Sequence, residues 1–337
     1  MSKWKKRGRG CLVIAGGTVI FLSLAGLVYQ AMKLRSDAAN YPPPGRMVAM
    51  GDYQMHIQET GNAGPVVVLE AGMGHNSLIW FKVQEEIGTF ARVVSYDRAG
   101  TGWSEVSPQP RDSNHIAAEL KTLLTKANVE GPYIMVGHSL GGLYVRSFAH
   151  AYPEDVAGMV LIDATHEEQF ERFPKELMGS MDTQLKLMGL AGKFAPFGVV
   201  RLLGLLESRS LSDNLKAAAD ATSNRNHVLG VMVEEFSNLN ASSKQVQKAG
   251  TLGNIPLVVL TGEQEDDPEM SPELNKQFTD LWIEMQKELS QLSGDSQWKV
   301  VEGSGHMIQL TRPEAVIEAI RAVVDKVNAL QVGATED

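Results

Sequence analysis

The chain of 337 residues is 43% hydrophobic and 21% charged, which suits a globular protein of one large or two smaller domains and excludes large-scale disorder. Its formal charge is −9, but residues 1–35 hold seven Lys or Arg and no acid, so the remainder carries −16. An acidic body argues against nucleic acid as a partner, because such binding depends on cationic contacts to phosphate. The only cysteine, Cys11, excludes an internal disulfide, and also a cysteine nucleophile or a thiolate metal cluster in the body.

The first 35 residues predict a membrane anchor. Residues 11–32 are uncharged, lie between basic residues and are numerous enough to cross a bilayer as a helix. The positive-inside rule places the N-terminus in the cytoplasm and everything after Arg35 outside. A cleaved signal peptide, giving a secreted protein, is the alternative, because residues 23–25 place small side chains at cleavage spacing. We favour the anchor, because the apolar stretch continues beyond them.

After the anchor, residues 36–46 predict a stiff proline-rich linker. Beyond it, short apolar runs alternate with helix-like segments, which predicts an α/β fold whose mostly parallel sheet is covered on both faces. We expect the core to comprise residues 47–164 and 250–330, with a tail at 331–337. The expected strands are 47–50, 53–59, 66–69, 93–96, 133–136, 158–162, 257–261 and 297–301, and the expected helices include 114–127, with Ser113 as N-cap, and 313–330.

Residues 165–249 interrupt the alternation of strands and helices. They favour helices and are rich in Met and Leu, so they predict a helical insertion between two strands. Flexible methionine side chains suit a surface that adapts to varied apolar ligands. The alternative is that these side chains only pack the insertion onto the core.

A predicted strand, a tight turn and a predicted helix surround Ser139. The turn reads Gly137-His138-Ser139-Leu140-Gly141. Glycines two positions before and after the serine allow the strand and the helix to approach closely. This pattern predicts that Ser139 is a nucleophile.

A nucleophilic serine needs a base to take its proton, and the base needs an acid to orient it. His306 follows the last expected strand on a glycine-flanked loop, at the sheet edge where sites form in parallel α/β proteins. We therefore expect His306 to be the base. Among the other histidines, His75 and His166 are the nearer candidates for contact with a substrate.

The acid has two candidate positions. Asp163 ends the expected strand 158–162, and a later acidic turn holds Glu265, Asp266 and Asp267. We favour Asp163, because its position at the strand end is unambiguous, while three carboxyls compete in the turn. The turn stays open as the alternative.

Acyl transfer also needs two backbone N–H donors for the oxyanion of the tetrahedral intermediate. Leu140, directly after the serine, is expected to supply one. Met73, in the glycine-rich loop 70–74 after the strand 66–69, is expected to supply the other. A phosphate cradle is the alternative for this loop, but it lacks the sequences of a P-loop and of a dinucleotide site.

Together these motifs resemble the α/β-hydrolase-fold serine hydrolases over residues 45 to about 327. The carriers are the Ser139 turn, the run Tyr96-Asp97-Arg98-Ala99-Gly100-Thr101-Gly102-Trp103-Ser104, the loop Gly72-Met73-Gly74, and Gly305-His306 before Arg312-Pro313-Glu314. The resemblance implies that the insertion is a lid, and that Ser139, His306 and Asp163 cleave ester or lipid substrates with apolar acyl groups, without cofactor or metal. An amide or peptide hydrolase, such as a proline-aminopeptidase-like enzyme, and a non-catalytic ligand-binding member are the alternatives.

Overall fold

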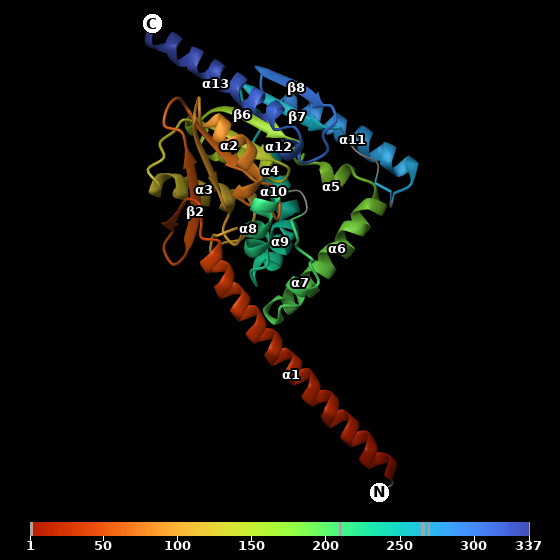
Figure 1. Ribbon diagram of the computed structural model, residues 1–337. Coiled ribbons are helices and arrows are strands. Elements are labelled where there is room, and N and C mark those ends of the chain that lie inside the picture. Colours follow the sequence, from red (N-terminus) through yellow and green to blue (C-terminus); the bar gives the residue numbers. More distant parts are fainter. Residues whose placement is uncertain (1–2, 209–210, 264–266, 269, 337) are drawn as a thin grey trace. The chain divides into compact units, whose positions relative to one another are not determined.

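The computed structural model describes residues 3–208, 211–263, 267–268 and 270–336, which form two compact units (Figure 1). The smaller unit comprises Met1–Pro42 and Lys186–Gly230. The larger comprises Pro43–Leu185 and Val231–Asp337. The predicted single insertion 165–249 is therefore divided, because its middle part associates with the N-terminal helix and its two ends with the core.

The larger unit is built on an eight-stranded sheet of order β1-β2-β4-β3-β5-β6-β7-β8 (Figure 1). β2 pairs antiparallel with β1 and with β4, and all other neighbours are parallel. The strands are β1 (Arg46–Ala49), β2 (Gln54–Thr60), β3 (Val66–Glu70), β4 (Arg92–Tyr96), β5 (Tyr133–His138), β6 (Val156–Ile162), β7 (Leu257–Gly262) and β8 (Ser296–Val301). All eight predicted strands are confirmed, and the boundaries differ by at most two residues.

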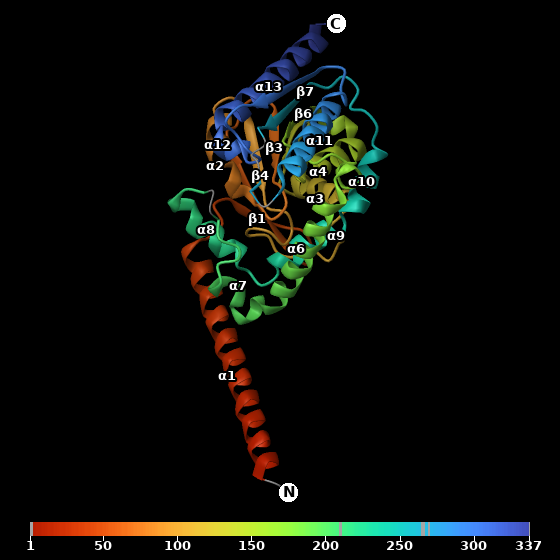
Figure 2. The same cartoon turned by 90° about the vertical axis from the view of Figure 1, so that its right-hand side faces the viewer.

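Helices cover both faces of the sheet, and Figure 2 shows the strands between them. One face packs against the apolar sides of α3, α4 and α11, and the other against those of α2, α12 and α13. Every residue of β3 and of β5 is buried, as expected for parallel strands covered on both faces. These helices are α2 (Phe81–Ile87), α3 (Ser113–Lys126), α4 (Gly141–Ala151), α11 (Pro272–Ser290), α12 (Ile308–Thr311) and α13 (Pro313–Glu336).

Two helix boundaries differ from the prediction. The N-cap of α3 is Asp112, not Ser113: its carboxylate accepts hydrogen bonds from the amides of Asn114 and His115, which a serine one position later would not satisfy. α13 continues to Glu336, so the predicted tail 331–337 is helical as far as it is described. Its Ala, Leu and Gln residues favour helix, and one glycine does not interrupt it.

Helices fill the predicted insertion between β6 and β7. They are α5 (Gln169–Arg172), α6 (Lys175–Phe194), α7 (Val199–Leu202), α8 (Asp213–Ser223), α9 (Val228–Ser237) and α10 (Leu239–Gln247), with the 3₁₀ turn η3 (Ala195–Phe197) before α7. The helical character expected from the sequence is confirmed.

The N-terminal helix α1 (Lys3–Asn40) is the one described helix long and apolar enough to cross a membrane. It runs further than predicted, because the linker expected at 36–46 is helical up to Asn40. Asp37 explains the extension: its carboxylate pairs with Arg201 Nη2 at 2.6 Å, and its carbonyl accepts the amide of Tyr41. Residues 41–45, which include the prolines at 42–44, remain as linker.

Candidate active site

Ser139 lies on the sharp turn between β5 and α4. Its φ angle is 53°, in the left-handed region that non-glycine residues rarely occupy. Glycines are needed on both sides: a Cβ on Gly137 would lie 2.7 Å from a methyl of Val145, and one on Gly141 would lie 2.7 Å from the carbonyl oxygen of Glu70. The close approach expected from the Gly137 and Gly141 spacing is therefore present.

His306 and Asp163 meet at the carboxyl edge of the sheet. Nδ1 of His306 lies 2.6 Å from Oδ2 of Asp163, and the Asp163 side chain is fully buried. The His306 loop also meets the Ser139 turn, because Nε2 of His138 donates to the carbonyl oxygen of His306 at 3.0 Å. With Nδ1 engaged by the carboxylate, Nε2 of His306 is the nitrogen left for a reacting group.

The other Asp163 oxygen is held by two donors. Oδ1 accepts the backbone N–H of Gly262 at 3.0 Å and the indole N–H of Trp282 at 2.9 Å. Gln286, one turn further along α11, donates to the carbonyl oxygen of Ala164 at 2.7 Å. α11 therefore fixes the side chain of Asp163 and the backbone of the next residue, a contribution absent from the sequence-based prediction.

Replacing Trp282 by phenylalanine should lower kcat roughly tenfold, because a hydrogen bond to a charged group is worth about 1.5–3 kcal/mol and part of it orients the acid. Phenylalanine preserves the ring contacts with Phe173 and Phe278. Trp298→Phe is the matched control, since the Trp298 indole donates to Thr261 Oγ1 and not to the acid. Equal rates for the two variants, measured on one ester substrate, would contradict this role.

Among the described residues, none of the alternative carboxyls takes part in the contact with Nδ1 of His306. Glu265 and Asp266 lie outside the described part of the chain. Asp267 is exposed, and its amide and carbonyl are hydrogen-bonded to the side chain of Asn275 on α11. Of the described candidates, Asp163 is the carboxyl that meets His306.

The predicted amide donors, Leu140 and Met73, are oriented by the carbonyls of the preceding residues. In a trans peptide the C=O and the following N–H point in opposite directions. The Ser139 carbonyl accepts the amides of Gly142 and Thr165, both at 2.9 Å, so the Leu140 N–H points away from these partners. The Gly72 carbonyl accepts Nη2 of Arg98 at 2.9 Å, so the Met73 N–H points away from Arg98.

Gly72 brings the Met73 loop against the serine. A Cβ on Gly72 would lie 3.0 Å from both Cβ of Ser139 and Nδ1 of His138, so a larger residue would push the loop away. The side chains of Met73 and Leu140 belong to one apolar cluster, which also includes Phe170 and Phe236 from the insertion. The two predicted donors and the serine therefore share one region with an apolar wall.

Arg98 is the buried centre that shapes the Met73 loop. Its guanidinium donates to the carbonyl oxygens of Ala71 at 2.6 Å and Gly72 at 2.9 Å. It also pairs with Glu70 at 2.7 Å and with Glu235 of α9 at 2.8 Å, and burial raises the pKa of the Glu70 carboxyl. In the sequence the Tyr96–Ser104 run is only one of the carriers of the family resemblance, yet its arginine sets the conformation of the loop beside Ser139.

Two further histidines lie beside the site. The rings of His138 and His306 are 4.8 Å apart, and those of His75 and His138 are 6.3 Å apart. Burial lowers the pKa of His138 well below its usual range. Burial, with a smaller contribution from electrostatic interaction with the His306 ring, lowers the pKa of His75 to about 4. Both imidazoles are therefore neutral at pH 7.

These neutral histidines make the fold sensitive to acid. In the unfolded chain His75 takes up a proton near pH 6.5, whereas the folded protein resists this until about pH 4. The free energy of unfolding should therefore decline as the pH falls from 6.5 towards 4. Thermal melts at neutral pH and near pH 5 should show a smaller drop in Tm for His75→Gln than for wild type. His150→Gln, at the exposed end of α4, is the control and should match wild type.

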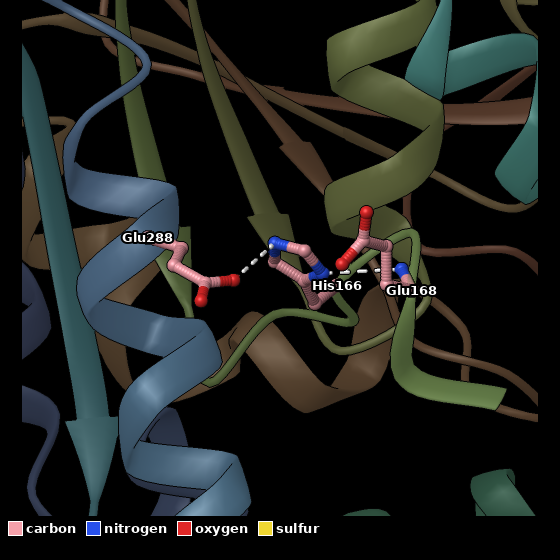
Figure 3. A group of neighbouring side chains, drawn as sticks. All are labelled: His166, Glu168 and Glu288. Atoms are coloured by element: carbon pink, nitrogen blue, oxygen red, sulfur yellow. Dashed lines mark hydrogen bonds and ion pairs between the residues drawn. The ribbon is translucent and has the colours of Figure 1, made fainter. Parts of the chain in front are cut away.

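His166, the second histidine considered for substrate contact, instead belongs to a polar cluster with Glu168 and Glu288 (Figure 3). Nδ1 of His166 accepts the amide of Glu168 at 3.1 Å, so Nε2 carries the hydrogen and faces Glu288 at 3.3 Å. Arg172 Nη1 lies 2.5 Å from the same Glu288 oxygen. This tautomer and the arginine favour an internal ion-pair cluster over a metal site, and the cluster fastens the start of the insertion to α11.

Comparisons with known proteins agree with this architecture. A family model described as the alpha/beta hydrolase fold matches residues 65–313. An AB hydrolase superfamily protein of Gibberella zeae is 27% identical over 77% of this chain and 86% of its own length. The uncharacterized protein YqjL of Bacillus subtilis is 28% identical over 77% and 83% of the two chains.

Solved structures show the same fold. A candidate lipase from Acinetobacter baumannii superposes with a TM-score of 0.63 at 21% identity, covering 89% of this chain and 97% of the other. A candidate epoxide hydrolase from Pseudomonas aeruginosa superposes with a TM-score of 0.65 at 16% identity, covering 86% and 98%. The resemblance deduced from the motifs is thus confirmed, and the chain belongs to the α/β-hydrolase fold family.

Proposed function

We propose that this protein is a membrane-anchored serine hydrolase that cleaves carboxylic esters with apolar acyl groups through an acyl-enzyme on Ser139. The observation that carries the proposal is the 2.6 Å contact between His306 and the buried Asp163, on a loop tied to the Ser139 turn. A serine at the nucleophile position argues against dehalogenase and epoxide-hydrolase chemistry, for which the same fold uses aspartate.

In this mechanism Nε2 of His306 takes the proton of Ser139 as its oxygen attacks the acyl carbonyl. The Asp163 carboxylate stabilises the resulting imidazolium and fixes its tautomer. The amides of Leu140 and Met73 hold the oxyanion, and each is worth about 3 kcal/mol in the transition state. His306 then protonates the leaving alcohol. In the second half of the reaction His306 takes a proton from water, which attacks the acyl-enzyme. The carboxylic acid product leaves when His306 returns that proton to the oxygen of Ser139.

The apolar acyl preference rests on the side chains near the two amides. Met73 and Leu140 lie in one cluster with Phe170 and Phe236, whose rings are 6.0 Å apart. Met232 of α9 packs against Gly74 of the same loop. These side chains offer hydrocarbon contacts to an acyl chain and no charge.

The anchor is the second part of the proposal. α1 has the length and the composition of a bilayer span, and the basic residues before it favour a cytoplasmic N-terminus with the catalytic unit on the opposite side.

Two assays test the enzymatic proposal. A fluorophosphonate probe should label the purified protein at Ser139. Aryl esters of graded acyl length should be hydrolysed, with medium or long chains preferred, whereas aminoacyl amides should not. Activity on amides alone would replace the esterase with a peptidase-like enzyme, and absence of labelling would indicate a non-catalytic binding protein.

A further inference from the structure

An exposed apolar face lies in the smaller unit, formed by Leu187, Leu190, Phe194, Leu202, Leu203 and Leu205 (the 187–205 face). Each of these side chains is between 47% and 66% exposed. Three of them, on α6, follow the helical spacing i, i+3 and i+7, so they share one side of the helix. Soluble proteins rarely leave so many large apolar side chains in water.

This exposure is concentrated in one part of the chain. Among the described residues outside α1 and this face, the exposed large hydrophobic residues are Val106, Val300, Leu330 and Val332. The face therefore differs from the scattered apolar residues of an ordinary surface.

Four contacts fix α1 to the rest of the smaller unit, three of them to residues 197–201. A Cβ on Gly26 would lie 2.5 Å from the carbonyl oxygen of Phe197, and Gly198 packs against the ring of Tyr29. The buried amide of Gln30 donates to the Asn224 carbonyl and to the Asn226 side chain, each at 2.9 Å. The ion pair of Arg201 with Asp37 adds a fourth contact. Figures 1 and 2 both show α7 beside α1.

Three of the four contact points on α1, Gly26, Tyr29 and Gln30, fall within the apolar stretch, and Asp37 lies beyond it. Gly26 lies seven residues before Lys33, the first charge after the stretch, which at 1.5 Å per residue is about 10 Å along the helix axis. Amphipathic helices at a membrane surface bury their apolar side about 5–10 Å deep. A segment that touches α1 at Gly26 is therefore at lipid depth wherever α1 spans a bilayer.

The charges of the segment also fit a lipid surface. Residues 186–206 contain Lys186, Lys193 and Arg201 and no acid, in a chain whose part after residue 35 carries −16; Arg201 is paired with Asp37, so the two lysines are the charges that bear on a headgroup layer. Lys and Arg beside an apolar face are typical of segments that lie on anionic bilayers.

We infer that the 187–205 face is immersed in the lipid leaflet from which α1 emerges at Lys33, so that the middle of the insertion is a second, interfacial membrane contact. This inference rests on the proposal that α1 spans a bilayer. The partner is a phospholipid surface with anionic headgroups, not a protein.

Depth-dependent fluorescence quenching tests this inference on the full-length protein. Cys11 is the only cysteine, so a Cys11→Ser background allows single-site labelling with an environment-sensitive fluorophore. Leu203→Cys reports on the face, Val28→Cys reports on α1, and Ala217→Cys, exposed on α8 of the same unit, is the matched control. A thermal melt of each labelled variant verifies folding before reconstitution into phosphatidylcholine–phosphatidylglycerol vesicles.

We expect spin-labelled lipids to quench the probes at positions 203 and 28, with a loss of fluorescence at 203 that is greater for a shallow nitroxide than for a deep one. The probe at 217 should stay unquenched. Quenching at 28 without quenching at 203 would overturn the interfacial contact and leave the anchor in place. Absence of quenching at 28 would overturn the anchor, and this inference with it. Fluorophosphonate labelling of the same vesicles reports separately on the enzyme.

Discussion

Ser139→Ala is expected to lower kcat/KM for a medium-chain aryl ester by roughly 10⁴- to 10⁶-fold, because the acyl-enzyme cannot form without its nucleophile. The variant should still hydrolyse the ester faster than the uncatalysed reaction in water, since the amides of Leu140 and Met73 still bind the oxyanion. Labelling by the fluorophosphonate should disappear altogether.

A second serine in the same region provides the control for this prediction. Ser304, two residues before His306, is buried and shares a 2.7 Å hydrogen bond with Thr311. Ser304→Ala removes a hydroxyl from the base's own loop without touching the proposed nucleophile, so labelling should persist and kcat should change little. If Ser139→Ala retained wild-type turnover while folding normally, the acyl-enzyme mechanism would be wrong.

Asp163→Asn is expected to cost roughly 10⁴-fold in kcat while leaving the fold intact. The amide has nearly the shape of the carboxylate, but its NH₂ group would donate to Nδ1 of His306. This forces the hydrogen onto Nε2, which then cannot accept the proton of Ser139. The same substitution removes the negative charge that stabilises the imidazolium.

The alternative carboxyls make this experiment decisive. Glu265→Gln and Asp266→Asn change charge in the acidic turn that the sequence offers as the rival position, and both should keep near-normal turnover. Steady-state rates of the three variants on one ester identify the acid. Loss of activity in Glu265→Gln or Asp266→Asn, with Asp163→Asn unaffected, would move the role to the turn.

Local patterns predicted the sheet and the serine turn well. The eight strands are continuous apolar or alternating runs bounded by turn residues, and hydrophobic burial acts on such runs wherever they occur in the chain. The Gly137 and Gly141 spacing is informative because the pattern is contained in five residues, although the approach that Gly141 permits is to Glu70 on a different strand.

Contacts between distant residues were less accessible to prediction. Trp282 lies 119 residues after the Asp163 side chain to which it donates, and no local pattern pairs them. The helix that carries it has a readable signal, since Phe278, Trp282, Met285 and Leu289 recur at helical spacing and lie buried or half-buried. The sequence could thus have predicted α11 but not its contact with the acid.

The helical extension of α1 was missed for the same reason, because a contact between distant residues supports it. Residues 36–40 include Ser36, Asp37 and Asn40 and are soon followed by three prolines, which locally favours a linker. Their helical state is supported by Arg201, more than 160 residues away, through its ion pair with Asp37. Tertiary contacts of this kind override weak local preference.

The Arg98 cluster limits how this protein could be shortened or recombined. Lidless variants of a hydrolase are attractive engineering targets, and the insertion between β6 and β7 is the obvious deletion. Glu235, however, belongs to that insertion and supplies one of the two carboxylates around a fully buried guanidinium. Excising it would leave part of a positive charge unmatched in the interior, at a cost of about 3–5 kcal/mol, which is a large fraction of a typical domain's stability. Tolerated length changes, natural or designed, should therefore fall within Lys186–Gly230, while the two ends of the insertion behave as part of the core.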